Sequence, residues 1–145
     1  MQSQIYLPVL IVISLNIANA DACRNPCPIP ETTKAFQSAS AVFKGKVLER
    51  IDGGMTDILS FEILNTWKGT VKRNQSVVAA SNTCDPMGDV ANVGDVFIVF
   101  AKSRRTSLDL ETGFCNGSKK LVGDKNENVL LETLDHLSKS DSQHK

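Results

Sequence analysis

The stretch ADACRNPCPIP, residues 20–30, places two cysteines and three prolines directly after an apolar N-terminal segment. A chain terminus is normally the most mobile part of a domain. Here Cys23 and Cys27 are potential disulfide anchors, and the prolines restrict the backbone around them. We therefore expect this terminus to be held in place and to be a working part of the protein, with the rest of the chain as its frame.

Residues 1–22 have the pattern of a signal peptide. Residues 4–17 are mostly apolar, and two small-x-small patterns follow, which permit cleavage after Ala20 or after Ala22. The apolar run is short for a membrane span, so a retained signal anchor is the weaker alternative. A lipoprotein processed at Cys23 is weaker still, because Ala20 stands where a Leu is usual. We expect a secreted protein, or a periplasmic one if the source is a Gram-negative bacterium.

Cleavage leaves about 125 residues, which is the size of one domain. Lys plus Arg and Asp plus Glu both number 16, and no long block of one sign occurs. Nucleic acid and membrane are therefore not expected as partners, and we expect a monomer. Four cysteines in an exported chain favour two disulfides over a zinc site, because Cys84 and Cys115 lack a second ligand at short spacing. The spacing alone leaves three pairings open.

Residues 23–137 have the pattern of one small β domain. A short helix is expected over residues 31–39, after Pro30. The continuously apolar run 96–101 should be the most buried strand. Gly45 suits a bend or bulge. Alternation places Phe43, Val47 and Ile51 on one face of the first strand, and Leu59, Phe61, Ile63 and Trp67 on one face of the second. The five expected strands cover residues 41–51, 56–67, 76–80, 96–101 and about 108–114, with loop over 81–88.

The last expected element is a helix. Asp124 is a candidate N-cap with Glu127 three residues on. An apolar pattern follows at Val129, Leu130, Leu134 and Leu137. Residues 138–145 are expected to be a frayed polar tail. Together these elements predict a mainly β fold: a disulfide-linked, five-stranded OB-type closed barrel with a short N-terminal helix and a C-terminal helix.

Catalytic constellations are not visible in the sequence. The two histidines are His136, on the expected closing helix, and His144, in the tail. No Ser or Cys has a plausible base partner, and no metal-ligand or phosphate-binding motif occurs. We predict that the protein is not an enzyme and needs no cofactor.

The order of several motifs resembles the tissue inhibitors of metalloproteinases (TIMPs), and more broadly the netrin-like modules. These motifs are the cysteines after the leader, AVFKGKV at 41–47, WKG at 67–69, Cys84, GDVFIVFA at 94–101, Cys115 and the closing helix. The resemblance covers nearly the whole mature chain. It is most evident with the short single-domain TIMP-like proteins.

The resemblance implies the disulfides Cys23–Cys84 and Cys27–Cys115. It also implies the function, inhibition of zinc metalloendopeptidases. In this family the first residue, here Cys23, chelates the zinc of the target protease through its free α-amine and its carbonyl oxygen, in the position of the metal's open-site water. The expected partner is therefore a zinc metalloprotease catalytic domain. The expected inhibitory ridge consists of Cys23, Arg24, Asn25, Pro26, Thr83, Cys84 and Asp85.

Two features leave an alternative open. The family has one residue between its first two cysteines, whereas this chain has three, which adds about 6.6 Å of extended backbone. Arg24 also stands where the family usually has a small side chain. The alternative is a netrin-like extracellular binding module without inhibitory activity.

Asn74 and Asn116 begin N-x-Ser sequons and are candidate glycosylation sites, although Asn116-Gly117 is also a turn sequence.

Overall fold

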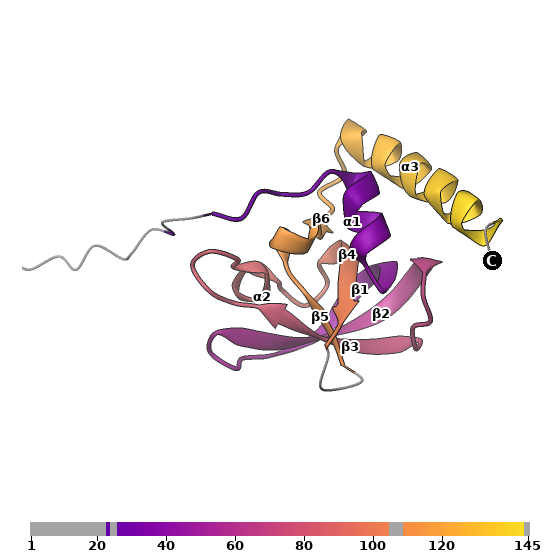
Figure 1. The fold of residues 1–145 in the computed structure, drawn as a ribbon. Helices are drawn as coiled ribbons and strands as arrows, with labels where there is room; N and C mark the ends of the chain where they lie inside the picture. The colour runs from indigo at the N-terminus through magenta and orange to yellow at the C-terminus, as the bar shows by residue number, and fades with distance from the viewer. Residues whose placement is uncertain (1–22, 24–25, 105–108, 144–145) are drawn as a thin grey trace, which may run out of the picture.

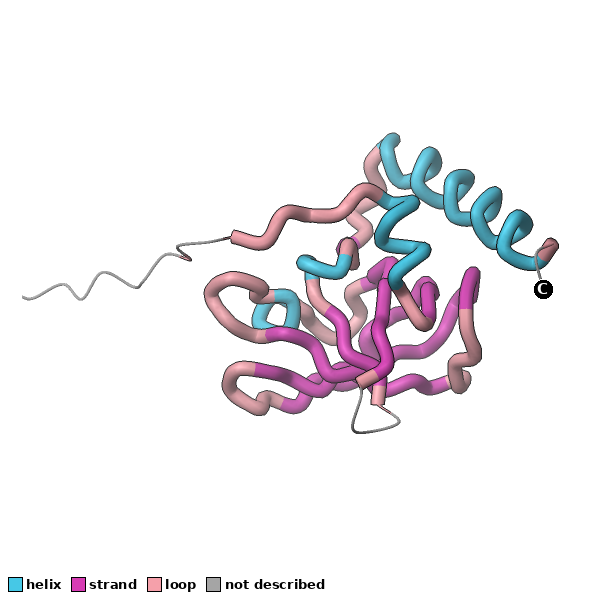
Figure 2. Tube along the Cα trace, in the orientation of Figure 1, coloured by secondary structure: helices cyan, strands magenta, loops and turns pink. Residues whose placement is uncertain are grey.

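The structure is a computed structural model that describes residues 23, 26–104 and 109–143 of the 145-residue chain. Figures 1 and 2 show a β-barrel with two helices at one end. In chain order the elements are α1 (Thr32–Ser38), β1 (Ala41–Ile51), β2 (Thr56–Lys68), β3 (Asn74–Ala80), α2 (Met87–Val90), β4 (Val96–Ser103), β5 (Leu110–Thr112), the 3-10 turn η1 (Phe114–Asn116), β6 (Lys119–Lys120) and α3 (Lys125–Ser142).

Five strands close the barrel in the order β1-β2-β3-β5-β4, and β4 pairs back onto β1. The β3–β5 pair is parallel and the other pairs are antiparallel. The two-residue strand β6 adds to the side of β4. This is the mainly β, closed OB-type barrel with flanking helices that the sequence predicts.

The strand β1 bends at Gly45, as expected, because it must pair with β2 on one side and β4 on the other. The register of the β1–β2 pair shifts between Lys44 and Gly45. A Cβ atom at Gly45 would lie 2.9 Å from Cδ1 of Phe61, so a side chain at this position would collide with the barrel interior. Glycine therefore permits the close strand approach that closes a small barrel.

The barrel interior is apolar and centred on three rings. Phe61 packs edge-on against Phe43 and Phe97, with ring centroids 5.8 and 6.2 Å apart. Ile51 was expected beside Phe43 but is 49% exposed. A register shift between Val47 and Glu49 moves the end of β1 off the alternation. The other buried residues of this core are Ala41, Val47, Leu59, Val77, Ala79, Met87, Ala91, Val99, Ala101 and Leu110.

A second core lies between the outside of the barrel and the helices α1 and α3. Ile98 and Phe100 of β4 face this core while their neighbours face the barrel interior, which explains the continuously apolar run in β4. Trp67 was expected with Phe61 but packs in the second core instead. The β1–β2 register shift between Lys44 and Gly45 inverts the alternation of β2 after Ile63, so that Thr66 pairs with Phe43 and Trp67 lies on the other face.

The closing helix α3 begins as predicted. The Asp124 side chain accepts hydrogen bonds from the backbone N–H groups of Asn126 and Glu127. Leu134 is fully buried, but Val129 is 64% exposed and does not belong to the buried face.

The end of α3 differs from the expected frayed tail. The helix continues through Ser142, and the Ser138 hydroxyl donates to the Trp67 carbonyl at 2.8 Å.

None of the helices among the described residues is long and apolar enough to cross a membrane.

Two short segments also differ from the sequence prediction. Met87–Val90 forms the helical turn α2 where composition predicted loop, because Met87 is fully buried in the barrel core. The strand β5 ends at Thr112, and Phe114 and Cys115 belong to η1.

Candidate functional site

Two disulfides join the N-terminal segment to separate loops. Cys23 pairs with Cys84 and Cys27 pairs with Cys115, with Cα–Cα distances of 4.9 and 5.5 Å. These are the pairs that the family resemblance implies. Although Cys27, Cys115 and Asp85 lie close together, the two sulfurs are bonded to each other and neither is a thiolate. The zinc-site alternative is therefore excluded for these cysteines.

The loop of residues 82–86, which we call the Cys84 loop, is held by hydrogen bonds between its own residues. The Asn82 side-chain oxygen accepts hydrogen bonds from the backbone N–H groups of Cys84 and Asp85, both at 3.0 Å. Reciprocal backbone bonds of 3.1 Å join Asn82 and Asp85 across the turn. This is an Asx-type turn, which leaves Thr83 and Cys84 exposed at its apex.

Asp85 joins the Cys84 loop to the second disulfide. The residue is 6% exposed, and its carboxylate accepts hydrogen bonds from the backbone N–H groups of Phe114 and Cys115, at 2.9 and 3.0 Å. A Cβ atom at Gly113 would lie 2.2 Å from this carboxylate, so a glycine is needed beside it. The Asp85 side chain thus faces inward and braces the site, whereas the inhibitory ridge was expected to include it as a flank.

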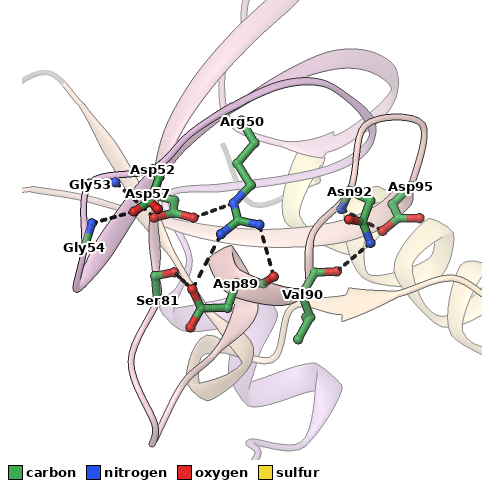
Figure 3. Close-up of polar contacts among 10 residues, drawn as sticks. All are labelled: Arg50, Asp52, Gly53, Gly54, Asp57, Ser81, Asp89, Val90, Asn92 and Asp95. Carbon is green, nitrogen blue, oxygen red and sulfur yellow. Dashed lines mark hydrogen bonds and ion pairs between the residues drawn. The ribbon is translucent and has the colours of Figure 1, made fainter.

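An ionic cluster around the buried Asp57 holds the other side of the Cys84 loop (Figure 3). Arg50 Nε donates to the fully buried Asp57 carboxylate at 2.6 Å, and Arg50 Nη1 donates to the Asp89 carbonyl at 3.1 Å. The Ser81 hydroxyl donates to the Asp89 carboxylate at 2.7 Å. Ser81 and Asp89 flank the Cys84 loop, so the cluster ties that loop to the β1–β2 hairpin.

Opposing effects act on the pKa of Asp57. Burial alone raises it, but the hydrogen bond and charge of Arg50 and the Gly53 N–H together hold the pKa below its ordinary value of 3.8. Asp57 is therefore ionised at neutral pH. No local pattern predicted this pair, because Arg50 and Asp57 meet only through the register of the hairpin.

The remaining predicted residues fall into three groups. Pro26 is exposed beside the first disulfide, and we call Cys23, Pro26, Thr83 and Cys84 the tethered tip. Arg24 and Asn25 lie outside the described residues. His136 lies on α3, the expected closing helix, and is exposed.

The two sequons differ in their surroundings. Asn74 is exposed at the start of β3. The sequon of Asn116 ends at Ser118, which is buried and hydrogen-bonded to the Thr112 hydroxyl and to the Phe100 backbone. In the folded protein Asn74 is therefore the more accessible of the two candidate glycosylation sites.

Fold and site together define a small disulfide-bonded five-strand barrel with a C-terminal helix, whose N-terminal segment is cross-linked to two loops. No protein-family model matches the chain, and no curated protein sequence matches it either. The tethered tip and the residue pattern around it are therefore the features from which a function can be inferred.

Proposed function

We propose that this chain is an exported inhibitor of zinc metalloendopeptidases, which acts through the α-amine and carbonyl oxygen of Cys23 at the mature N-terminus. The observation that carries the proposal is the Cys23–Cys84 disulfide, which fixes residue 23 to an exposed, hydrogen-bonded loop. The resemblance to TIMPs supports the same function. Two disulfides are also typical of proteins that mature in an oxidising compartment.

The chemistry of the tip suits a catalytic zinc. Such a zinc has three protein ligands and holds water in its open position. A terminal amine and the adjacent carbonyl oxygen displace that water as a two-point ligand. The amine binds only when unprotonated, and its reference pKa of about 7.7–8 makes deprotonation inexpensive at neutral pH.

Rigidity of the tip supports tight binding. Association costs less conformational entropy when the binding segment is ordered beforehand. The Asx turn at Asn82, the Asp85 bonds to residues 114 and 115, and the Arg50 cluster all restrain the Cys84 loop. A strained or mobile loop would lose this advantage.

Arg24 defines the kind of target pocket. In the proposed complex it follows the chelating residue and points into the protease's primed-side pocket. Burying an unpaired guanidinium is costly, so the matching pocket is acidic or open to water. The inhibitor should therefore prefer proteases whose primed-side pocket is acidic or open to water.

The second candidate is a netrin-like extracellular binding module that does not inhibit proteases. The spacing favours it, because three residues separate Cys23 and Cys27 and the added chain displaces one of them relative to the family pattern. In this case the barrel and both disulfides serve only to present a binding surface.

The decisive experiment compares two N-termini of the same oxidised protein. One form begins at Cys23 and the other retains Asp21 and Ala22, so that its Cys23 nitrogen is an amide. Against a panel of zinc endopeptidases, the Cys23 form should inhibit at least about a hundredfold more strongly. Selective acetylation of the Cys23 amine should abolish that difference.

The outcomes separate the candidates. Equal inhibition by the acetylated form would refute chelation. Absence of inhibition by every form, with both disulfides intact by mass, would favour the binding module. Edman sequencing of the exported protein adds an independent check, because an N-terminal Asp21 is incompatible with the chelating mechanism.

A further inference from the structure

A groove of about 450 Å³ lies away from the tethered tip, between the segment that follows Cys27, the turn η1, the strand β6 and the helix α3. Figure 1 shows these elements around the same end of the barrel. The Cys27–Cys115 disulfide holds two walls of the groove together, because Ile29 and Pro30 follow Cys27 and Phe114 precedes Cys115.

The groove walls are mainly apolar and accessible. Ile29, in the segment after Cys27, and Val129, on α3, both line the groove and are 74% and 64% exposed. Phe114 and Leu130 are partly buried and pack against the two cores beneath. Exposed apolar side chains that line one hollow on a small domain indicate a binding site rather than isolated surface residues.

The charged residues of the groove have one sign. Lys119 and Lys120 line it, and no Asp or Glu is among its described lining residues. The Lys120 amine forms an ion pair of 2.7 Å with Asp95 and is neutralised there. Lys119 is exposed and forms no ion pair with any residue in the described part of the chain. Within the described part of the chain, the groove thus combines apolar walls with one cation, Lys119, that has no ion-pair partner.

We propose that this groove binds a small amphiphilic carboxylate with a single apolar chain, of the medium-chain fatty acid class. The apolar chain would lie against Ile29, Phe114 and Val129, which removes apolar surface from water on both partners. The carboxylate would pair with Lys119, and the uncharged polar side chains of Thr32, Asn126 and Thr133 line the same groove. A ligand with one negative charge would complement the charge of Lys119.

Decanoate, used below its micellar concentration, tests the proposal by isothermal titration calorimetry on the oxidised protein. We expect saturable one-to-one binding, and binding of decyltrimethylammonium that is at least about tenfold weaker. The cationic probe has an alkyl chain of nearly the same length and the opposite charge, so the comparison tests whether the positive charge of the groove contributes to binding. Absence of saturable decanoate binding, or equal binding of both probes, would overturn the proposal.

Matched variants locate the binding. Val129→Glu and Lys119→Glu should each weaken decanoate binding at least about tenfold. The controls are Val93→Glu, which changes a valine that is 68% exposed but lies outside the groove, and Lys102→Glu on β4. The controls should bind within about twofold of the unmodified protein. Equal loss in the controls would show that decanoate binds elsewhere.

Sedimentation velocity without ligand tests the competing occupant, a second copy of the chain. The unmodified protein and Val129→Glu should both sediment as monomers. A dimer that Val129→Glu dissociates would identify the groove as a subunit interface and would overturn the proposal. All four altered residues are on the surface, so thermal unfolding by circular dichroism should show unchanged folding.

Discussion

Asp57 is fully buried, and the folded structure stabilises the ionised form of its carboxylate. The pKa of Asp57 lies below 3.8 in the folded protein. At a pH near these pKa values, the folded protein therefore binds fewer protons than the unfolded chain does. The contribution of ionised Asp57 to the free energy of unfolding is therefore fully present above the pKa that Asp57 has in the unfolded chain. It is lost as the pH falls through the pKa that Asp57 has in the folded protein. Asp95 behaves in the same way: burial raises its pKa, but the hydrogen bond and charge of Lys120 outweigh this and lower it.

We predict that Asp57→Asn lowers the free energy of unfolding by about 1–3 kcal/mol at pH 7, because Arg50 loses its buried charged partner and keeps only the longer ion pair with Asp89, at 3.5 Å. The difference from the unmodified protein should shrink below about pH 3.8, where Asp57 itself becomes protonated. Urea unfolding from pH 7 to pH 2 measures both. Asp95 is present in both proteins, so its titration cancels in the difference.

Glu132→Gln is the control for this residue. Glu132 is exposed on α3, and the same loss of one carboxylate there should change stability by less than about 0.5 kcal/mol at every pH. A difference between Asp57→Asn and the unmodified protein that stays constant down to pH 2 would contradict the assigned pKa shift.

At the scale of single elements, the cap of α3 connects the helix to the second core. Asp124 accepts two backbone hydrogen bonds at the first turn, and the Glu127 side chain accepts from the backbone N–H groups of Val122 and Gly123. Further along the helix, Leu134 packs in the second core and Asp135 accepts from the Trp67 indole at 2.6 Å. The position of the cap thus sets which helix face covers Trp67.

We predict that Asp124→Ala lowers the free energy of unfolding by about 1 kcal/mol, because two N–H groups lose their acceptor. Urea unfolding monitored by Trp67 fluorescence measures this, since Trp67 is the single tryptophan. Glu132→Ala, in the exposed middle of the same helix, should be nearly neutral. If both variants lost the same free energy of unfolding, the cause would be the charge on the helix and not the lost cap.

The elements also show what could be predicted from the sequence. The apolar run of β4 and the capping pair Asp124 and Glu127 carry local signals, so the buried strand and the start of the closing helix were predicted correctly. Ile51 and Trp67 were assigned to the wrong surroundings, because a β-bulge interrupts the alternation and leaves no periodic signature of its own. The helix α2 was missed because burial of Met87, a tertiary effect, stabilises a four-residue turn.

The candidate site was predictable only in part, for a related reason. Cysteine positions and the family pattern point to the tethered tip. The inward orientation of Asp85 depends on Gly113, which is distant in sequence, and the Arg50–Asp57 pair depends on the register of a hairpin. Contacts of this kind arise from the closed barrel and have no counterpart in local composition.

At the scale of the whole molecule, the two disulfides attach the N-terminal segment to a barrel that has its own apolar core. The bonds span 61 and 88 residues, and no cysteine belongs to either buried cluster. The chain-entropy model gives each a stabilisation of about 4 kcal/mol or more, and measured losses are typically about 2–5 kcal/mol. Reduction should therefore destabilise the barrel without removing any of its core contacts.

We predict that reduction lowers the free energy of unfolding by at least about 2 kcal/mol but leaves the far-ultraviolet circular dichroism of the barrel unchanged at 25 °C. Inhibition by the Cys23 form should be lost under the same conditions, because residue 23 is then no longer fixed to the Cys84 loop. Paired urea titrations and inhibition assays, with intact mass to count thiols, measure all three effects. If the exported protein carries four free thiols and still inhibits, the tip needs no sulfur bridges, and the proposed mechanism fails for this molecule.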